Sequence, residues 1–168
     1  MSLKSRVLLV DDDPALVRLL TQLFRDAGYE TEGAGSVHEG VAAAGKRTFD
    51  VALIDLNLPD GTGLDLLTQL RMLRPELSVI WLTAAGSIEA AVEAMRRGAD
   101  NFVVKPVDPP ALFAVVDKGV EACTLRRRTL HLDRLSETPV ARVLGQSAVM
   151  KQALQLAERV APHDTTVL

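Results

Sequence analysis

The stretch Val7-Leu8-Leu9-Val10-Asp11-Asp12-Asp13-Pro14 decides the fold. Its four apolar residues form a continuous run, which is typical of a parallel strand buried on both faces. Three aspartates follow directly, and Asp13 before Pro14 pairs a helix-capping residue with a proline in the first helical turn. The stretch therefore predicts a buried strand, an acidic loop and a helix in succession.

The same alternation of apolar runs and helical patterns continues over about the first 120 residues. Five strands are expected, at 7–10, 29–34, 51–54, 79–82 and 102–104. The run at 29–34 is the most polar, which suits an edge strand. Strands that alternate with helices favour an α/β fold with parallel pairing. We therefore predict a doubly wound, five-stranded parallel sheet in the flavodoxin-like order 2-1-3-4-5.

Cap and turn residues mark where the expected helices begin and end. Ser36 with Glu39 matches a capping box at the start of the second helix. The segment Leu58–Gly63 has the composition of a turn. Ser87 is expected to cap a helix that runs to Arg97.

Four of the expected strands end in side chains that can act together chemically. Asp11 and Asp12 follow the first strand, Asp55 the third, Thr83 the fourth and Lys105 the fifth. A doubly wound sheet brings the carboxyl ends of its strands to one edge, where its ligands bind. Clustered carboxylates must bind a cation, share protons or shift their pKa, and oxygen ligands with open positions suit Mg²⁺. A carboxylate beside Mg²⁺ can attack phosphorus, while an ammonium and a hydroxyl stabilise the phosphoryl oxygens, so the set suits an aspartyl phosphate.

These residues resemble the receiver domains of response regulators, the CheY-like family of two-component signalling. The resemblance is carried by the motifs Leu9-Val10-Asp11-Asp12, Asp55-Leu56-Asn57-Leu58-Pro59, Leu82-Thr83-Ala84 and Lys105-Pro106. They fall in the family's order and spacing and cover residues 6–120. The family's fold is the (βα)5 arrangement predicted above.

The resemblance also implies a role for each group. A sensor histidine kinase would donate a phosphoryl group to Asp55, and the domain would be a switch and not an enzyme. The ligands of Mg²⁺ would be Asp11, Asp12, Asp55 and the backbone carbonyl of Asn57. Thr83 and Lys105 would contact the phosphoryl group, and Thr83 and Phe102 would carry the conformational switch. Phe102 is expected to be a core residue whether or not it has this switch role.

The composition is that of a globular protein of 168 residues, with 48% hydrophobic and 24% charged residues and a net charge of −3. This charge gives no general attraction to nucleic acid. No apolar run approaches the roughly 18 residues of a membrane span, and no leader sequence is seen. The single cysteine, Cys123, excludes an internal disulfide and is expected to be an unreactive helical residue in a cytoplasmic protein.

The chain changes character after about residue 120. We expect a receiver domain at 1–122, a helical linker at 123–140 and the beginning of another domain at 141–168. Leu125 and Leu132 lie seven residues apart, a heptad pattern too short to indicate a coiled coil alone. The hypothesis is that the linker is a dimerisation segment, so that the protein is a homodimer or higher oligomer. The run Arg126–Arg128 is expected to be solvated helix surface.

Residues 143–150, 157–161 and 165–168 resemble the opening of the AAA+ ATPase domain of NtrC-type, sigma-54-dependent regulators. The resemblance implies that the chain stops at the beginning of that domain. The full protein would contact sigma-54 RNA polymerase and DNA through further domains. The alternative for this segment is a generic linker helix.

Two other functions remain open. An aspartate-nucleophile phosphohydrolase also uses Mg²⁺ on a doubly wound sheet, but it would want an acid two residues after its nucleophile, and Asn57 stands there after Asp55. A receiver-shaped module that only binds partners would not need the complete set of acidic, hydroxyl and lysine groups. The stretch Gly40–Arg47 nearly matches a phosphate-binding loop, but it lacks the final hydroxyl and its alanines favour a helix.

Overall fold

A computed structural model describes residues 4–84, 92–93 and 95–136. The chain divides into two units, residues 1–127 and 128–168. Of the second unit, only the end of a helix that stops at Ser136 is described. The resemblance found at 143–168 and the expected cap at Ser87 lie outside the described residues. Of the helices described, none combines the length and the apolar composition that crossing a membrane requires.

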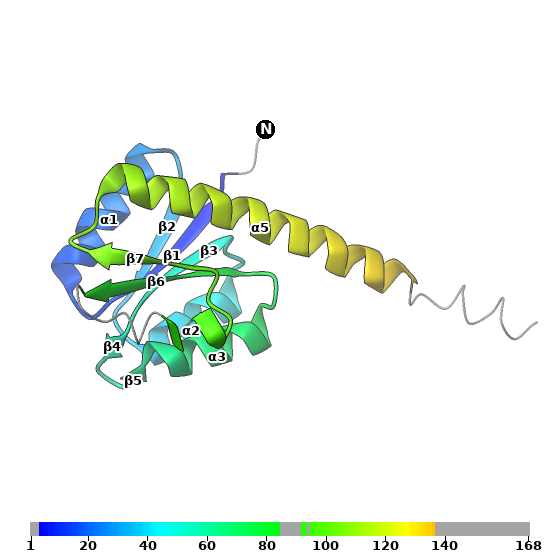
Figure 1. Ribbon diagram of the computed structural model, residues 1–168, viewed down its shortest axis with the longest axis horizontal. Coiled ribbons are helices and arrows are strands. Elements are labelled where there is room, and N and C mark those ends of the chain that lie inside the picture. Colours follow the sequence, from blue (N-terminus) through cyan, green and yellow to red (C-terminus); the bar gives the residue numbers. More distant parts are fainter. Residues whose placement is uncertain (1–3, 85–91, 94, 137–168) are drawn as a thin grey trace, which may run out of the picture. The chain divides into compact units, whose positions relative to one another are not determined.

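Five parallel strands form one sheet in the order β2-β1-β3-β6-β7 (Figure 1). They are β1 (Arg6–Val10), β2 (Glu30–Ala34), β3 (Val51–Asp55), β6 (Ser78–Ala84) and β7 (Asn101–Lys105). Two short strands, β4 (Asn57–Leu58) and β5 (Gly61–Thr62), pair separately as an antiparallel hairpin. Since β4 and β5 are numbered between β3 and β6, the order of the main sheet is the predicted 2-1-3-4-5, with the polar β2 at an edge.

Helices cover both faces of the sheet, α1 and α5 on one side and α2 and α3 on the other (Figure 1). Their bounds are α1 (Pro14–Asp26), α2 (Val37–Lys46), α3 (Gly63–Leu73) and α5 (Pro109–Ser136). The predicted cap of α1 is confirmed, because the Asp13 carboxylate accepts hydrogen bonds from Ala15 N at 2.8 Å and Leu16 N at 3.3 Å. Gly28 follows α1 with φ +93°, a conformation in which glycine carries no steric penalty.

Alternate residues of the three central strands, β1, β3 and β6, build two separate cores. In β1, Val7 and Leu9 pack with Phe24 of α1 and with residues of α5. Leu8 and Val10 face the opposite way and pack against α2 and α3. A shift of one residue in the strand would exchange the two sets, so the helices on both faces fix the register.

One cap prediction needs correction, and the predicted turn is confirmed as part of a hairpin. Ser36 Oγ accepts a hydrogen bond from Glu39 N at 3.1 Å, but the Glu39 carboxylate accepts one from Gly35 N, so the reciprocal bond of a capping box is missing. The complete box lies at the start of α3, between Thr62 and Asp65. The predicted turn at Leu58–Gly63 is the β4–β5 hairpin and the first residue of α3.

Gly40–Arg47 lies in and just after α2, which confirms that it is no phosphate loop.

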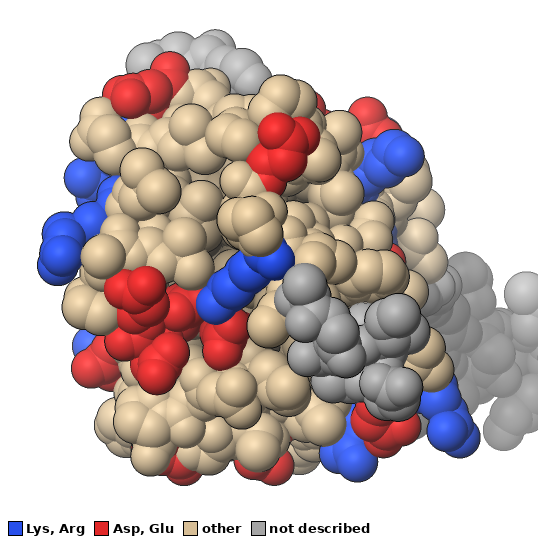
Figure 2. Space-filling view, turned by 60° about the vertical axis from the view of Figure 1, so that its left-hand side comes forward, with Lys and Arg blue, Asp and Glu red and all other residues tan. Residues whose placement is uncertain are grey.

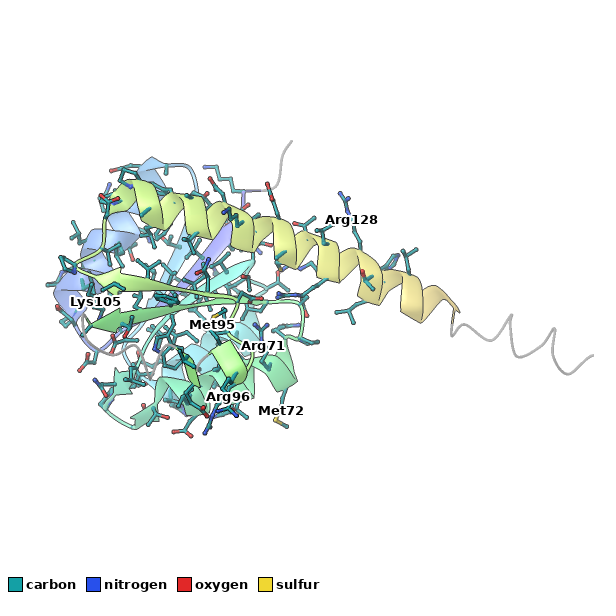
Figure 3. All side chains as sticks on the ribbon, in the orientation of Figure 1. Arg71, Met72, Met95, Arg96, Lys105 and Arg128 are labelled. Carbon is teal, nitrogen blue, oxygen red and sulfur yellow. The ribbon has the colours of Figure 1, made fainter. Side chains whose placement is uncertain are left out.

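The arginine run of α5 is not free helix surface. Arg126 pairs with Asp100, and Arg127 donates hydrogen bonds to Asp50 Oδ1 at 2.6 Å and to Phe49 O at 2.7 Å. The expectation was therefore wrong for these two residues, because acidic groups just before β3 and β7 lie beneath the helix. Arg128 is exposed and points away from the helix axis (Figure 3).

Candidate functional site

The carboxyl ends of the strands bring four of the predicted residues to one edge of the sheet. Asp55 is the last residue of β3 and Lys105 the last of β7. Asp11 directly follows β1, and Thr83 is next to last in β6. Figure 3 shows Lys105 at the end of β7. On the face turned forward in Figure 2, Asp and Glu side chains gather beside a basic side chain.

Lys105 bridges two carboxylates from different strands. Its Nζ lies 2.6 Å from Asp11 Oδ2 and 2.5 Å from Asp55 Oδ1. The side chains of Asp11 and Asp55 are only 3% and 11% exposed. Desolvation alone would lower the pKa of Lys105, but hydrogen bonds and charge from both aspartates outweigh it and raise that pKa. The ammonium therefore stays charged and offsets part of the buried negative charge.

Each buried carboxylate is also oriented by a backbone amide two residues further along the chain. Asp11 Oδ1 accepts a hydrogen bond from Asp13 N at 2.9 Å, and Asp55 Oδ2 accepts one from Asn57 N at 2.9 Å. One oxygen of each carboxylate thus faces the backbone and the other faces Lys105. Several hydrogen bonds thus orient both carboxylates and the ammonium, as a site for charged groups requires.

Asp12 and Asn57 lie at the outer part of the site, and both are exposed. A pocket of about 220 Å³ opens beside Asp11 and Asp12 and is also lined by Arg18 of α1 and Glu39 of α2. Water can reach Asp11 and Asp12 from this pocket, so a hydrated cation has room to approach these two carboxylates.

The two predicted switch residues differ in burial. Thr83 is 3% exposed, and its hydroxyl makes a long hydrogen bond of 3.4 Å to the carbonyl of Ala84. Phe102 is 43% exposed, so the expectation of a core residue was wrong. The reason is its place in β7, where Val103 packs into the core and Phe102, one residue away, points to the other face.

Gly63 is a site residue that the sequence analysis did not single out. A Cβ at this position would lie 2.2 Å from the carbonyl oxygen of Asp55 and 3.0 Å from the Trp81 ring. Gly63 N also donates a hydrogen bond to Leu56 O at 2.8 Å. The start of α3 therefore packs directly on the chain that carries Asp55, and only glycine fits there. The signal was the second glycine of Gly61-Thr62-Gly63, which a simple turn does not require.

The chemistry of these side chains fits a divalent cation. Asp11, Asp12 and Asp55 bring three negative charges and Lys105 one positive charge, which leaves a surplus of two. Within the part of the chain that the structure describes, no three Asp, Glu, His or Cys side chains form a ready-made metal site. Mg²⁺ usually keeps several waters and needs only one or two carboxylates, so the set fits Mg²⁺ once the Lys105 ammonium gives way.

Comparison with known families decides between the readings of this site. A family model for the response regulator receiver domain matches residues 7–117. The chain belongs to this family. Its function as a receiver domain of two-component signal transduction is thereby confirmed, and so is the predicted fold. Receiver domains of transcriptional regulators are not generally enzymes, which goes against the phosphohydrolase alternative.

Relatives and solved structures extend the comparison beyond the family model. The receiver chain is 34% identical to the alginate biosynthesis transcriptional regulatory protein AlgB of Pseudomonas aeruginosa, over 98% of this chain and 37% of that protein. A CheY-like receiver domain from Methanospirillum hungatei is 34% identical and covers 74% of this chain and 99% of its own, with a TM-score of 0.70. NtrX from Brucella abortus, solved in complex with ADP, is 33% identical with a TM-score of 0.73, over 95% of this chain and 35% of its own. The chain thus spans little more than a third of these larger regulators.

Proposed function

We propose that Asp55 accepts a phosphoryl group from a sensor histidine kinase in the presence of Mg²⁺. The observation that carries the proposal is the pair of buried carboxylates, Asp11 and Asp55, held by one ammonium at the ligand-binding edge of the sheet. Two carboxylates that share a single counter-ion leave charge for a cation to neutralise. Asp55 is the last residue of β3, the central strand of the sheet, and the carboxyl ends of β6 and β7 lie at the same edge.

The phosphoryl transfer would use the side chains that meet at this edge of the sheet. A carboxylate oxygen of Asp55 attacks phosphorus, the P–N bond of the phosphohistidine breaks, and its electron pair returns to the imidazole of the kinase. Asp11, Asp12, Asp55 and the backbone carbonyl of Asn57 would hold Mg²⁺, which when bound would supply positive charge for the oxygens of the transferring group. Lys105 moves its ammonium from the two carboxylates to the new phosphoryl group, which carries a charge near −2.

The same step operates the proposed switch. Thr83 turns its hydroxyl from the Ala84 carbonyl to a phosphoryl oxygen, and this movement shifts an equilibrium between two states. Thr83 stands opposite Val104 in the β6–β7 pairing, and Phe102 stands opposite Trp81. Phe102 and Val104 are 43% and 44% exposed, so a movement of β7 changes an apolar surface that partners can read.

We further propose that this receiver domain controls a sigma-54-dependent transcription activator in the cytoplasm. In this proposal residues 1–122 are the receiver, 123–140 a linker that dimerises, and 141–168 the beginning of an AAA+ domain. Further domains of the full protein would contact sigma-54 RNA polymerase and DNA. The support is the similarity to AlgB, a transcriptional regulatory protein, and to NtrX, a structure that contains ADP.

Intact mass spectrometry after incubation with Mg²⁺ and acetyl phosphate tests the acceptor. We expect a gain of about 80 Da, one phosphoryl group, that is lost at alkaline pH. Asp55→Asn and omission of Mg²⁺ should each abolish it. Asp13→Asn is the matched control, since asparagine keeps the helix cap and only removes a neighbouring charge. An adduct that persists in Asp55→Asn would refute the assignment, and no adduct with no Mg²⁺ binding would indicate an interaction module.

A further inference from the structure

Asp60 connects the hairpin after Asp55 to the N-terminus of α2. Its Oδ1 accepts a hydrogen bond from Val37 N at 2.7 Å, and its Oδ2 accepts one from His38 N at 2.9 Å. These are the first two amides of α2, which have no carbonyl partner within the helix. The hydrogen bond from His38 N makes the largest contribution to the pKa of Asp60 and lowers it. Together with a smaller contribution from the Val37 N hydrogen bond, it outweighs desolvation, so the pKa of Asp60 is lowered. A carboxylate from a different element thus completes the helix end.

The other end of the hairpin is joined to the acceptor. Asn57 N donates a hydrogen bond to Asp55 Oδ2, and Asn57 pairs with Thr62 across the hairpin. Gly63, which follows Thr62, lies against the backbone of Asp55. Between the strands stand only Pro59 and Asp60, so Asp60 is at the tip of the hairpin and Asn57 at its base.

The hairpin has too few residues to fix its own position. Each strand contributes two residues, and an isolated two-stranded hairpin is marginal in water even when it is longer. Contacts at the base and at the tip therefore act together to orient the hairpin. The tip also packs closely, since a Cβ on Gly61 would lie 3.2 Å from Val37 Cγ2. The tip of the hairpin is consequently attached to α2, while its base is attached to the chain around Asp55.

We propose that Asp60 is a positioning residue for the phosphoryl-acceptor site: it clamps the hairpin tip to α2 and so holds the backbone carbonyl of Asn57 toward Mg²⁺. This inference rests on the function proposed above. A partner that orients a metal ligand typically changes metal affinity by about 10- to 100-fold when it is lost. The effect should therefore fall on the Mg²⁺ requirement and not on the maximal rate.

The simpler role, a cap that only stabilises α2, makes a different prediction. Ser36 caps the same helix end through Glu39 N but has no hydrogen bond to the hairpin among those described. Ser36→Ala therefore removes a cap of α2 and leaves the clamp intact. Asp60 is exposed, so Asp60→Ala leaves no cavity in the core.

The test measures phosphorylation by acetyl phosphate, followed by intact mass, over a series of Mg²⁺ concentrations. For Asp60→Ala we expect a half-saturating Mg²⁺ concentration about tenfold higher than in the wild type, with the rate at saturating Mg²⁺ changed by less than about twofold. Asp60→Asn keeps one acceptor oxygen, so its half-saturating Mg²⁺ concentration should lie between those of the wild type and Asp60→Ala. Ser36→Ala should lower the thermal midpoint as much as Asp60→Ala while its Mg²⁺ requirement stays that of the wild type.

Two outcomes would overturn the inference. An unchanged Mg²⁺ requirement in Asp60→Ala would show that the clamp does not reach the site, and an equal increase in Ser36→Ala would reduce Asp60 to an ordinary cap. If the wild type is phosphorylated normally, either outcome leaves the proposed function standing. A wild type that neither binds Mg²⁺ nor gains a phosphoryl group would refute both.

Discussion

Lys105 is the residue whose removal should separate metal binding from phosphoryl transfer. Its ammonium lies within 2.6 Å of Asp11 and Asp55, where it repels a second cation. In Lys105→Met we expect Mg²⁺ to bind several-fold more tightly and phosphorylation by acetyl phosphate to become about tenfold slower, because the charge that stabilises the transferring oxygens is gone. Without Mg²⁺ the variant should be about 1–2 kcal/mol less stable, since two carboxylates lose their partner.

Thermal unfolding with and without Mg²⁺, together with the phosphorylation rate, checks this prediction. Mg²⁺ should raise the midpoint more in Lys105→Met than in the wild type, because a ligand stabilises the folded state according to its affinity. Lys118→Met, at an exposed position of α5, serves as the control and should match the wild type in both assays. Weaker Mg²⁺ binding in Lys105→Met would contradict the competition inferred here.

Single residues also show what the sequence could and could not predict. Asp11, Asp55, Thr83 and Lys105 were found because strand ends in a doubly wound sheet must meet. Cys123 was expected to be unreactive, and its burial indeed raises the pKa of the thiol to about 11. The roles of Gly63 and Asp60 escaped prediction because they depend on contacts across the fold, with Asp55 in one case and with α2 in the other.

At the scale of elements, Asp100 ties together two helices and the sheet. It pairs with Arg71 of α3 and Arg126 of α5 and accepts a hydrogen bond from Val79 N in β6. Desolvation alone would raise the pKa of Asp100, but the hydrogen bonds from Arg126, Val79 and Arg71 outweigh it and lower that pKa. The attachment of α5 to the sheet should therefore depend on pH.

The lowered pKa of Asp100 determines whether the protein becomes more or less stable as the pH falls. The carboxylate stabilises the fold at pH values above its unfolded pKa of about 3.9, and this contribution is lost as the pH falls through the folded pKa. In Asp100→Asn we expect lower stability at pH 7 and a smaller further loss as the pH falls below about 4, measured by urea unfolding. Glu30→Gln breaks the exposed Arg6–Glu30 pair, where solvent screens the charges, and should keep nearly the acid dependence of the wild type. An unchanged acid dependence in Asp100→Asn would rule out this carboxylate as its source.

Elements with a strong periodic pattern were predicted well, and short or tertiary features were not. All five strands of the main sheet were expected, four of them from continuous apolar runs and β2 as a more polar edge strand. The β4–β5 hairpin has strands of two residues, too short for any alternation to appear. The pairing of Arg126 with Asp100 spans 26 residues and leaves no local signal, so Arg126 looked like ordinary helix surface.

At the scale of the whole molecule, the question is whether α5 joins two copies of the chain. The helix runs without a break to Ser136, and Leu125 and Leu132 on it are 61% and 65% exposed. Seven residues make almost two helical turns, so both leucines lie on one side of the helix, as in a coiled-coil seam. Apolar side chains so exposed are stabilised when a second helix covers them, which supports the proposal that this segment dimerises.

Leu132→Glu should break such a dimer, because it places a charge in an apolar interface. We expect the dissociation constant of the dimer to rise at least about tenfold, measured by light scattering over a range of protein concentrations. Leu19→Glu is the matched control, since Leu19 of α1 is also 65% exposed but carries no heptad partner in the proposed seam. Both variants add the same charge, so a general effect of charge would change the dissociation constant of the dimer equally in both. Equal shifts in the two variants, or a wild type that stays monomeric at every concentration, would contradict dimerisation through α5.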